Sequence, residues 1–210
     1  MAKEHAFTKG IPFVISGPSG CGKGTIVKAL LEKYPERFAL SVSATTRKMR
    51  EGEKDGVQYY FISKEEFERR IAAGDILEYT TYSNEYYGTP KTQVYAHTEM
   101  GRSVILEIEV EGAMHVRELL PEAFLIFVLP PNAETLEARL RGRGTNTEED
   151  IQRRLARAKE EIKMLPYYDY VIVNEDGGAA AAADEIAEIL SAEQKRVCRQ
   201  KEIAANFFLA

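Results

Sequence analysis

Residues 11–25 read IPFVISGPSGCGKGT, and this stretch decides the fold. An apolar run ends at Ser16, a glycine-rich turn follows, and apolar residues then recur at Ile26, Leu30 and Leu31 with the spacing of a helix. The turn matches the pattern GxxxxGK, which binds phosphate where it joins a strand to a helix. Glycines let the backbone amides of such a turn point inward at a helix N-terminus, where the helix dipole favours an anion. The sequence therefore predicts a strand, a phosphate-binding loop and a helix in that order.

Further apolar runs have the length of buried strands: SVILEIEV from Ser103, FLIFVLPP from Phe124 and YVIVN from Tyr170. Runs of this kind that alternate with helical stretches are typical of a parallel sheet with helices on both faces. We therefore predict the α/β class, with a P-loop NTPase-type three-layer core around a parallel sheet. The alanine run from Ala179 predicts a C-terminal helix that continues through EIAEILSAEQKRVCRQKEI.

Two interruptions break this pattern. Between about residues 41 and 93 the chain is rich in charged residues and tyrosine, which predicts an inserted α+β lobe. RLRGRGTNTEEDIQRRL, from Arg139, sets arginines and glycines in a short turn between two helical patterns and predicts a mobile lid. We expect a single domain of residues 1–210, with a core of 11–40, 94–138 and 156–190, a lobe of about 41–93, a lid of about 139–155 and a C-terminal helix or tail of 191–210.

The composition excludes several classes of function. The formal net charge of −5, from 33 acidic and 28 basic residues, does not provide the basic field that a general nucleic-acid surface needs. Two cysteines without paired spacing predict neither a disulfide framework nor a structural zinc site, and fit a reducing compartment. No run of 18 apolar residues occurs in the sequence. We expect a cytoplasmic protein that binds neither nucleic acid nor membrane.

The glycine-rich loop is the predicted ATP site. Lys23 is expected to reach the β- and γ-phosphates. Gly24 stands where most loops of this type carry the Ser or Thr that helps to hold Mg²⁺, so Thr25 is the nearest hydroxyl and a weak metal ligand. Cys21 has two interpretations, a small residue that fills space or a thiol with a lowered pKa. The predicted ATP-binding residues of the loop are Gly17, Pro18, Ser19, Gly20, Cys21, Gly22, Lys23, Gly24 and Thr25.

The segment SVSATTRKMREGEKDGVQYYF, residues 41–61, followed by LEY and YYGT, resembles the signature of the guanylate kinase family. The resemblance continues through LEIEVEGA from Leu106, FLIFVLPP, RLRGRGT and YDYVIVN, so that it covers most of the chain from Ile11. It implies ATP-dependent phosphorylation of GMP, and of dGMP, to the diphosphate in purine nucleotide metabolism, with Mg²⁺ as cofactor.

A second phosphate site is expected in the insert. Arg47 and Arg50 lie close enough in sequence to converge on a dianionic monophosphate, which planar guanidinium groups bind through charge-assisted hydrogen bonds. The resemblance implies that these arginines, with the hydroxyls of Tyr59 and Tyr87, bind the phosphate of GMP. Glu53 is expected to support the arginines. Without the motif, a solvated basic loop and packing tyrosines would explain the same residues.

A carboxylate distinguishes guanine from adenine, because guanine offers adjacent N1–H and amino donors where adenine has an acceptor. Glu78 in ILEY matches the family position with this role, and the resemblance implies that the hydroxyls of Ser43 and Thr89 also reach the base. The familiar GNYYG reads NEYYG here, which keeps Tyr87 and Gly88.

The expected chemistry needs no general base. A phosphate oxygen of GMP is ionised near neutral pH, because the second phosphate pKa is about 6, and catalysis reduces to alignment and charge neutralisation. The resemblance implies that three lid arginines close over the phosphates, that Glu109 lies near the metal and GMP, and that Asn174 contacts adenine. These arginines are Arg139, Arg143 and Arg154, and an ordinary helix surface is their alternative interpretation.

Two rival functions stay open. A kinase for AMP, CMP or dTMP would share the loop and the lid, whereas a non-catalytic guanylate-kinase-like binding module would share only the fold. The intact Lys23 loop opposes the second alternative. The sequence leaves the oligomeric state open, a homodimer included, because the segment from Ser191 could pack on the core or form a dimer contact.

Overall fold

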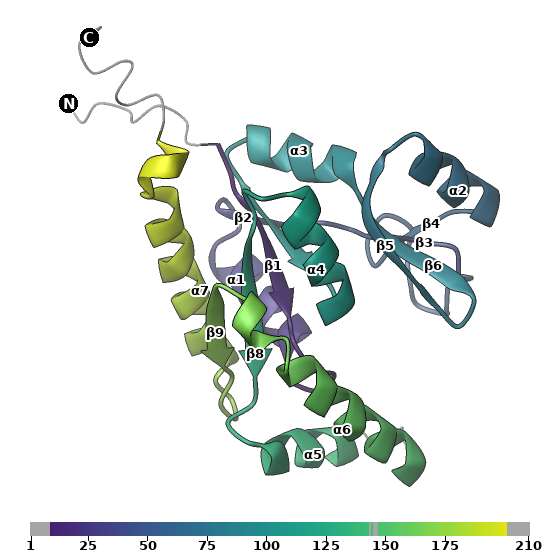
Figure 1. Cartoon of the computed structure of the whole chain (residues 1–210), viewed down its shortest axis with the longest axis vertical. Helices are drawn as coiled ribbons and strands as arrows, with labels where there is room; N and C mark the ends of the chain where they lie inside the picture. The colour runs from purple at the N-terminus through teal and green to yellow at the C-terminus, as the bar shows by residue number, and fades with distance from the viewer. Residues whose placement is uncertain (1–8, 143, 145–146, 201–210) are drawn as a thin grey trace, which may run out of the picture.

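The central sheet has five parallel strands. The computed structural model describes residues 9–142, 144 and 147–200, and Figure 1 shows the sheet flanked by helices. The strands follow the order β2-β7-β1-β8-β9, and every neighbouring pair is parallel, which confirms the predicted α/β class. Their bounds are β1 (Pro12–Ser16), β2 (Phe38–Leu40), β7 (Ser103–Glu107), β8 (Phe124–Leu129) and β9 (Tyr170–Val173).

Helices cover both faces of this sheet. Successive side chains of a strand point to opposite faces, and here the side chains on each face are apolar and pack against helices. On β1, Phe13 and Ile15 pack in one buried cluster with α1 (Lys23–Lys33) and α7 (Ala179–Gln194). Val14, between them, packs in a second cluster with α3 (Lys91–Glu99) and α4 (Val110–Leu119). All five residues of β1 are buried. A strand that is apolar from Pro12 to Ile15 is what a sheet covered on both faces requires, and Ser16 at its end is buried as well.

Two element boundaries and one strand differ from the sequence expectations. The run SVILEIEV is a strand only as far as Glu107, and α4 begins at Val110, so Glu109 is the N-cap residue of a helix. The C-terminal helix α7 ends at Gln194, and a short 3-10 helix, η2 (Val197–Arg199), follows in place of further α-helix. β2 was not predicted, because its three residues give no usable periodicity.

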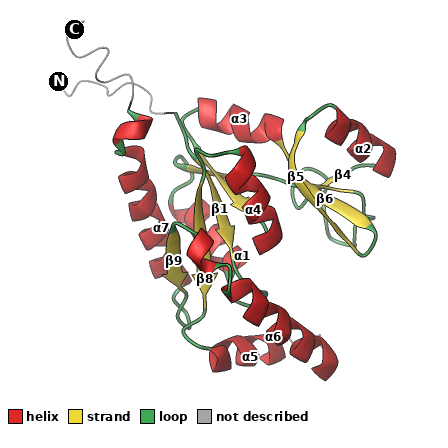
Figure 2. Ribbon diagram, viewed as in Figure 1, coloured by secondary structure: helices red, strands yellow, loops and turns green. Residues whose placement is uncertain are grey.

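A second, four-stranded sheet lies within the predicted insert, to one side of the core (Figure 2). The turn between its two longest strands has positive φ at Ser83 (51°) and Asn84 (64°), as tight hairpins need. Phe67 is fully buried beneath this sheet. The elements, with strand order β4-β3-β6-β5, are β3 (Ala44–Thr45), β4 (Tyr60–Phe61), α2 (Lys64–Ala72), β5 (Ile76–Tyr82) and β6 (Glu85–Pro90).

Helices α5 (Ala133–Gly142) and α6 (Glu148–Ile162) form a pair with its own small core, and a 3-10 helix, η1 (Leu165–Tyr167), follows. Thr147 begins α6 with a capping box, since its side chain and that of Asp150 satisfy each other's backbone amides. Arg143, a predicted catalytic residue, lies outside the described residues. Within the described part of the chain, no helix is long and apolar enough to cross a membrane.

Candidate functional site

The phosphate loop connects β1 to α1 and packs against the end of β9. Gly22 caps α1 with φ of 95°, and a Cβ there would lie 2.2 Å from Nδ2 of Asn174. That Nδ2 donates to the carbonyl oxygen of Cys21 at 2.8 Å. A larger residue at position 22 would therefore be strained and would also displace Asn174. Asn174 is buried, and its place beside the loop gives it a structural contact to the predicted ATP site.

Lys23 opens α1 and folds back over the loop. Its Nζ donates to the carbonyl oxygens of Gly17 at 2.5 Å and Pro18 at 3.4 Å. A cavity of about 910 Å³ lies beside it. Seven of the nine predicted ATP-binding residues line this cavity, namely Gly17, Ser19, Gly20, Gly22, Lys23, Gly24 and Thr25.

Cys21 is fully buried in the loop. Burial raises the pKa of its thiol, and the nearby Lys23 ammonium only partly opposes this effect. The interpretation as an activated thiol required a lowered pKa and is therefore wrong. Cys21 fills space beneath the loop, since a Cβ added at Gly17 would lie 3.2 Å from its Sγ.

Two of the predicted lid arginines contact the loop region. Arg154 of α6 donates from Nη1 to Oγ of Ser19 at 2.7 Å and lines the cavity. Arg139 of α5 donates to the carbonyl oxygen of Asn174 at 2.8 Å and forms an ion pair with Asp176 at 2.7 Å. Arg139 thus lies behind the loop and lines another part of the surface. Arg154 is the one of the two whose guanidinium faces the phosphate-loop cavity.

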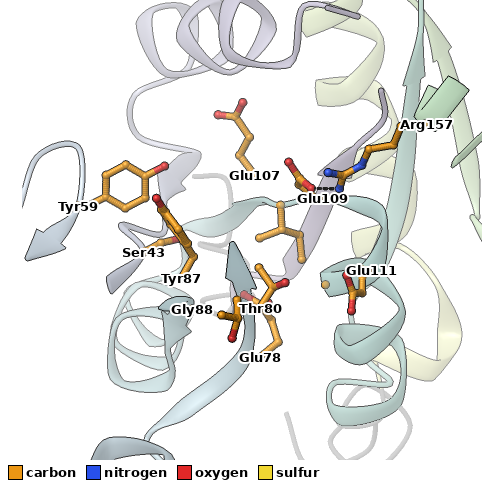
Figure 3. Close-up of a pocket in the computed structure, with 13 residues that line it drawn as sticks. Ser43, Tyr59, Glu78, Thr80, Tyr87, Gly88, Glu107, Glu109, Glu111 and Arg157 are labelled. Atoms are coloured by element: carbon orange, nitrogen blue, oxygen red, sulfur yellow. Dashed lines mark hydrogen bonds and ion pairs between the residues drawn. The ribbon is translucent and has the colours of Figure 1, made fainter. Parts of the chain in front are cut away.

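A second cavity, of about 340 Å³, adjoins the first and lies between the second sheet and α4 (Figure 3). Both Glu78 and Tyr87 line it. The two cavities form one continuous cleft, because six residues line both of them. These residues are Ser43, Tyr59, Glu107, Ile108, Glu109 and Arg157.

Glu78 on β5 is only 6% exposed and lines the second cavity. Its Oε1 accepts a hydrogen bond from the hydroxyl of Thr89 at 2.6 Å. Its Oε2 packs against Gly112 of α4, where an added Cβ would lie 2.9 Å away. Burial raises the pKa of this carboxyl, and the Thr89 hydrogen bond opposes the rise. The structure thus brings together Glu78 and Thr89, whose hydrogen bond orients the carboxylate in the cavity wall.

The predicted phosphate-binding residues of the insert are only partly assembled. Arg47 forms a bidentate pair with Glu53, at 2.6 and 2.7 Å, and its guanidinium lies 5.0 Å from the ring centre of Tyr59. Hydrogen bonds from Arg47 and from the backbone N–H of Arg50 lower the pKa of Glu53 to about 2. The rings of Tyr59 and Tyr87 meet edge to face at 5.8 Å. The side chain of Arg50 is exposed and lines neither cavity.

Glu107 is a site residue that the sequence reasoning missed. It ends β7, next to β1, and its Oε1 would lie 3.6 Å from a Cβ at Gly24. The walls of the cleft desolvate this carboxyl and raise its pKa, although its side chain still reaches solvent, and Lys23 opposes the shift. An acidic residue at the carboxyl end of a strand beside the loop strand is the signal that could have identified it.

Arg157 and Glu161 of α6 were also missed. Arg157 donates from Nη2 to Glu109 and from Nε to Glu161, the latter at 2.8 Å. Figure 3 shows Arg157 and Glu109 pointing toward each other at the wall of the cleft. Arg157 follows Arg154 by one helical turn, so both side chains leave the same face of α6. That spacing is the sequence signal for Arg157.

Comparisons with known proteins show the family to which the chain belongs. A family model described as Guanylate kinase matches residues 9–193. Guanylate kinase of Clostridioides difficile is 52% identical over 200 residues, covering 95% of this chain and 96% of the relative. Guanylate kinase of Enterococcus faecalis is 47% identical over 191 residues, covering 91% and 93%. The crystal structure of guanylate kinase from Anaplasma phagocytophilum superimposes with a TM-score of 0.73 at 35% identity, covering 95% of this chain and 96% of that one. The chain belongs to the guanylate kinase family.

Proposed function

We propose that the protein transfers the γ-phosphoryl group of ATP to GMP, and also to dGMP, and releases ADP and GDP or dGDP. The observation that carries the proposal is the continuous cleft, with the Lys23 loop in one cavity and the buried Glu78 in the adjoining one. In the reaction a GMP phosphate oxygen forms a bond to the γ-phosphorus while the bond from that phosphorus to the β-bridging oxygen breaks. The electron pair of that bond leaves with ADP.

Glu78 selects the base. Its carboxylate accepts hydrogen bonds from the N1–H and amino groups of guanine, which stabilise the charged form that burial alone disfavours. Adenine would place an acceptor against the same oxygens and leave them unpaired. Thr89 fixes the carboxylate through Oε1. Ser43 supplies a hydroxyl in the same cavity.

The GMP phosphate binds between the two tyrosines and the two arginines of the insert. Tyr59 and Tyr87 line the cavity and offer hydroxyl donors. Arg47 lies against Tyr59, and Glu53 keeps its guanidinium in place. The exposed Arg50 moves in when the insert, at about 41–93, closes over the nucleotide. Arg50 then donates charge-assisted hydrogen bonds to the GMP phosphate.

The remaining groups neutralise charge on the transferring phosphoryl group. Lys23 binds the β- and γ-phosphates, Arg154 approaches them from α6, and Asn174, which also contacts the loop at Cys21, contacts adenine. Arg139 and Arg143 act when the lid, at about 139–155, closes. Because closure excludes water only when both substrates are bound, ATP hydrolysis without GMP is slow.

Mg²⁺ fits the oxygen donors beside the loop. Thr25 and Glu107 both line the phosphate-loop cavity and would hold the ion directly or through water, with phosphate oxygens completing the shell. Within the described part of the chain, no cluster of three or more His, Cys, Asp or Glu side chains is arranged around a metal. A shell built mainly from substrate oxygens is the arrangement that Mg²⁺ favours in such enzymes. When bound there, Mg²⁺ would neutralise part of the negative charge of the phosphates.

Three further properties stay predictions: a cytoplasmic location, the absence of nucleic-acid and membrane partners, and assembly as a homodimer. A non-catalytic binding module of the same fold is the second candidate, and the intact Lys23 loop with Arg154 facing it opposes that alternative.

The test is release of ADP from MgATP in the presence of GMP, dGMP, AMP, CMP or dTMP, with wild-type protein and Lys23→Ala. We expect turnover with GMP and dGMP only, and its loss in Lys23→Ala. Preference for another monophosphate would contradict the assignment of the base pocket. Nucleotide binding without turnover would favour the binding module.

A further inference from the structure

Three carboxylates lie in or beside the wall that the two cavities share, at a site that receives two anions. Glu107 and Glu109 line both cavities, and Glu161 lines the phosphate-loop cavity. Glu161 is 13% exposed, and burial together with the charge of Glu109 raises the pKa of its carboxyl. Phosphate groups that meet at this wall would be repelled by unpaired carboxylates.

Arg157 is placed to remove this repulsion. Its guanidinium donates to Glu109 through Nη2 and to Glu161 through Nε, at 2.8 Å for the second contact. It reaches the wall from α6, whereas Glu109 is the N-cap residue of α4, and Figure 3 shows the two side chains pointing toward each other. Arg157 lines both cavities itself. One cation therefore bridges two carboxylates at the place where the acceptor and donor phosphates must approach each other.

We propose that Arg157 is a positioning residue for the reaction: it neutralises Glu109 and Glu161, and so allows the GMP phosphate to approach the phosphate loop. This inference rests on the proposed function. Because both described contacts of the guanidinium are to carboxylates, Arg157 acts through Glu109 rather than by binding phosphate itself. Its removal leaves two unpaired acidic groups beside the substrates, and the resulting repulsion weakens GMP binding.

A double-mutant cycle tests this mechanism. Arg157→Gln, Arg157→Lys, Glu109→Gln and the Arg157→Gln/Glu109→Gln double variant are compared by steady-state kinetics and by calorimetric titration with GMP. Arg141→Gln is the matched control, since Arg141 also bridges two carboxylates of the α5–α6 pair, Glu137 and Glu148, but lines neither cavity. A general loss of stability in this helix pair would affect both arginine variants alike.

We expect Arg157→Gln to raise the KM and Kd for GMP about tenfold, a coupling of the size found for charged groups in contact, while kcat changes less than about threefold. Arg157→Lys keeps GMP affinity within about threefold of wild type, because the positive charge beside the two carboxylates remains. The loss of affinity from Glu109→Gln to the double variant is smaller than the loss from wild type to Arg157→Gln, because only Glu161 is then left unpaired. Arg141→Gln leaves both constants unchanged.

Unchanged GMP affinity in Arg157→Gln would overturn the inference. So would a loss that Glu109→Gln does not relieve, because a direct phosphate contact or a purely structural role would persist in the double variant. A wild-type protein that does not phosphorylate GMP would refute the proposed function. An active wild type with unchanged GMP affinity in Arg157→Gln would refute only the role of Arg157.

Discussion

The substitution Gly112→Ala adds one methyl group beside Glu78. We expect it to change GMP binding without lowering the stability of the fold. Gly112 lies in the first turn of α4, and its missing side chain leaves space for Oε2 of Glu78. In Gly112→Ala the new Cβ would lie 2.9 Å from that oxygen, closer than side chains normally approach. The oxygen is the far end of a flexible side chain, so the carboxylate moves and the helix does not.

Gly112→Ala should raise the stability of the fold and lower the affinity for GMP. Alanine in a helix is more stable than glycine by about 0.5–1 kcal/mol, which in a chain of this size corresponds to about 1–4 °C in Tm. The displaced carboxylate loses one charge-assisted hydrogen bond to guanine, worth about 1.5–3 kcal/mol, or about 10–150-fold in affinity. We therefore expect a variant that is as stable as wild type, or more so, and that binds GMP much more weakly.

Thermal denaturation gives the first quantity, and the KM for GMP at saturating MgATP gives the second. Gly142→Ala, at the end of α5, is the control, because a Cβ there meets no atom within 4 Å. It should leave the KM for GMP unchanged. If Gly112→Ala binds GMP as wild type does, the oxygen that faces Gly112 does not contact the base, and the assignment of Glu78 fails.

Three further predictions follow from the contacts of the cleft. Arg154→Ala should lower kcat by about 100-fold with little change in Tm, since it removes one transition-state cation from a partly exposed site; an unchanged kcat in a stopped assay would exclude this role. Iodoacetamide should modify the exposed Cys198 and leave the buried Cys21 unmodified until the protein is denatured, as mass spectrometry would show; rapid modification of both would contradict the raised pKa of Cys21. Because the folded pKa of Glu53 is lowered to about 2, the stability that its pair with Arg47 contributes should be complete above about pH 4.5 and should be lost as the pH falls toward 2; a stability difference between wild type and Glu53→Gln that stays constant over this range would refute it.

The parallel core could be predicted from sequence because each central strand is a continuous apolar run. Such runs arise where both faces of a strand are buried, as at Phe13, Val14 and Ile15. The run from Ser103 misled for the same reason, since its apolar residues continue past Glu107 into the first turn of α4. Periodicity alone could not show that the strand ends where Glu107 enters the cleft.

The site was predicted where it follows a motif and missed where it depends on tertiary contacts. The loop glycines and Glu78 lie in recognisable segments. Arg157 and Glu161 lie on a charged helix surface, and only the approach of α6 to α4 brings Arg157 to Glu109. Arg50 illustrates the opposite case, because its motif position is clear while its side chain is exposed in this structure.

The most direct test of the central claim is the ratio of kcat/KM for GMP to kcat/KM for AMP, measured with MgATP in wild type and in Glu78→Gln. We expect a strong preference for GMP in wild type and a ratio about 10–100 times lower in Glu78→Gln, because the amide loses one of the two charge-assisted hydrogen bonds to guanine. An unchanged ratio would contradict the claim that the buried carboxylate of Glu78 selects the base.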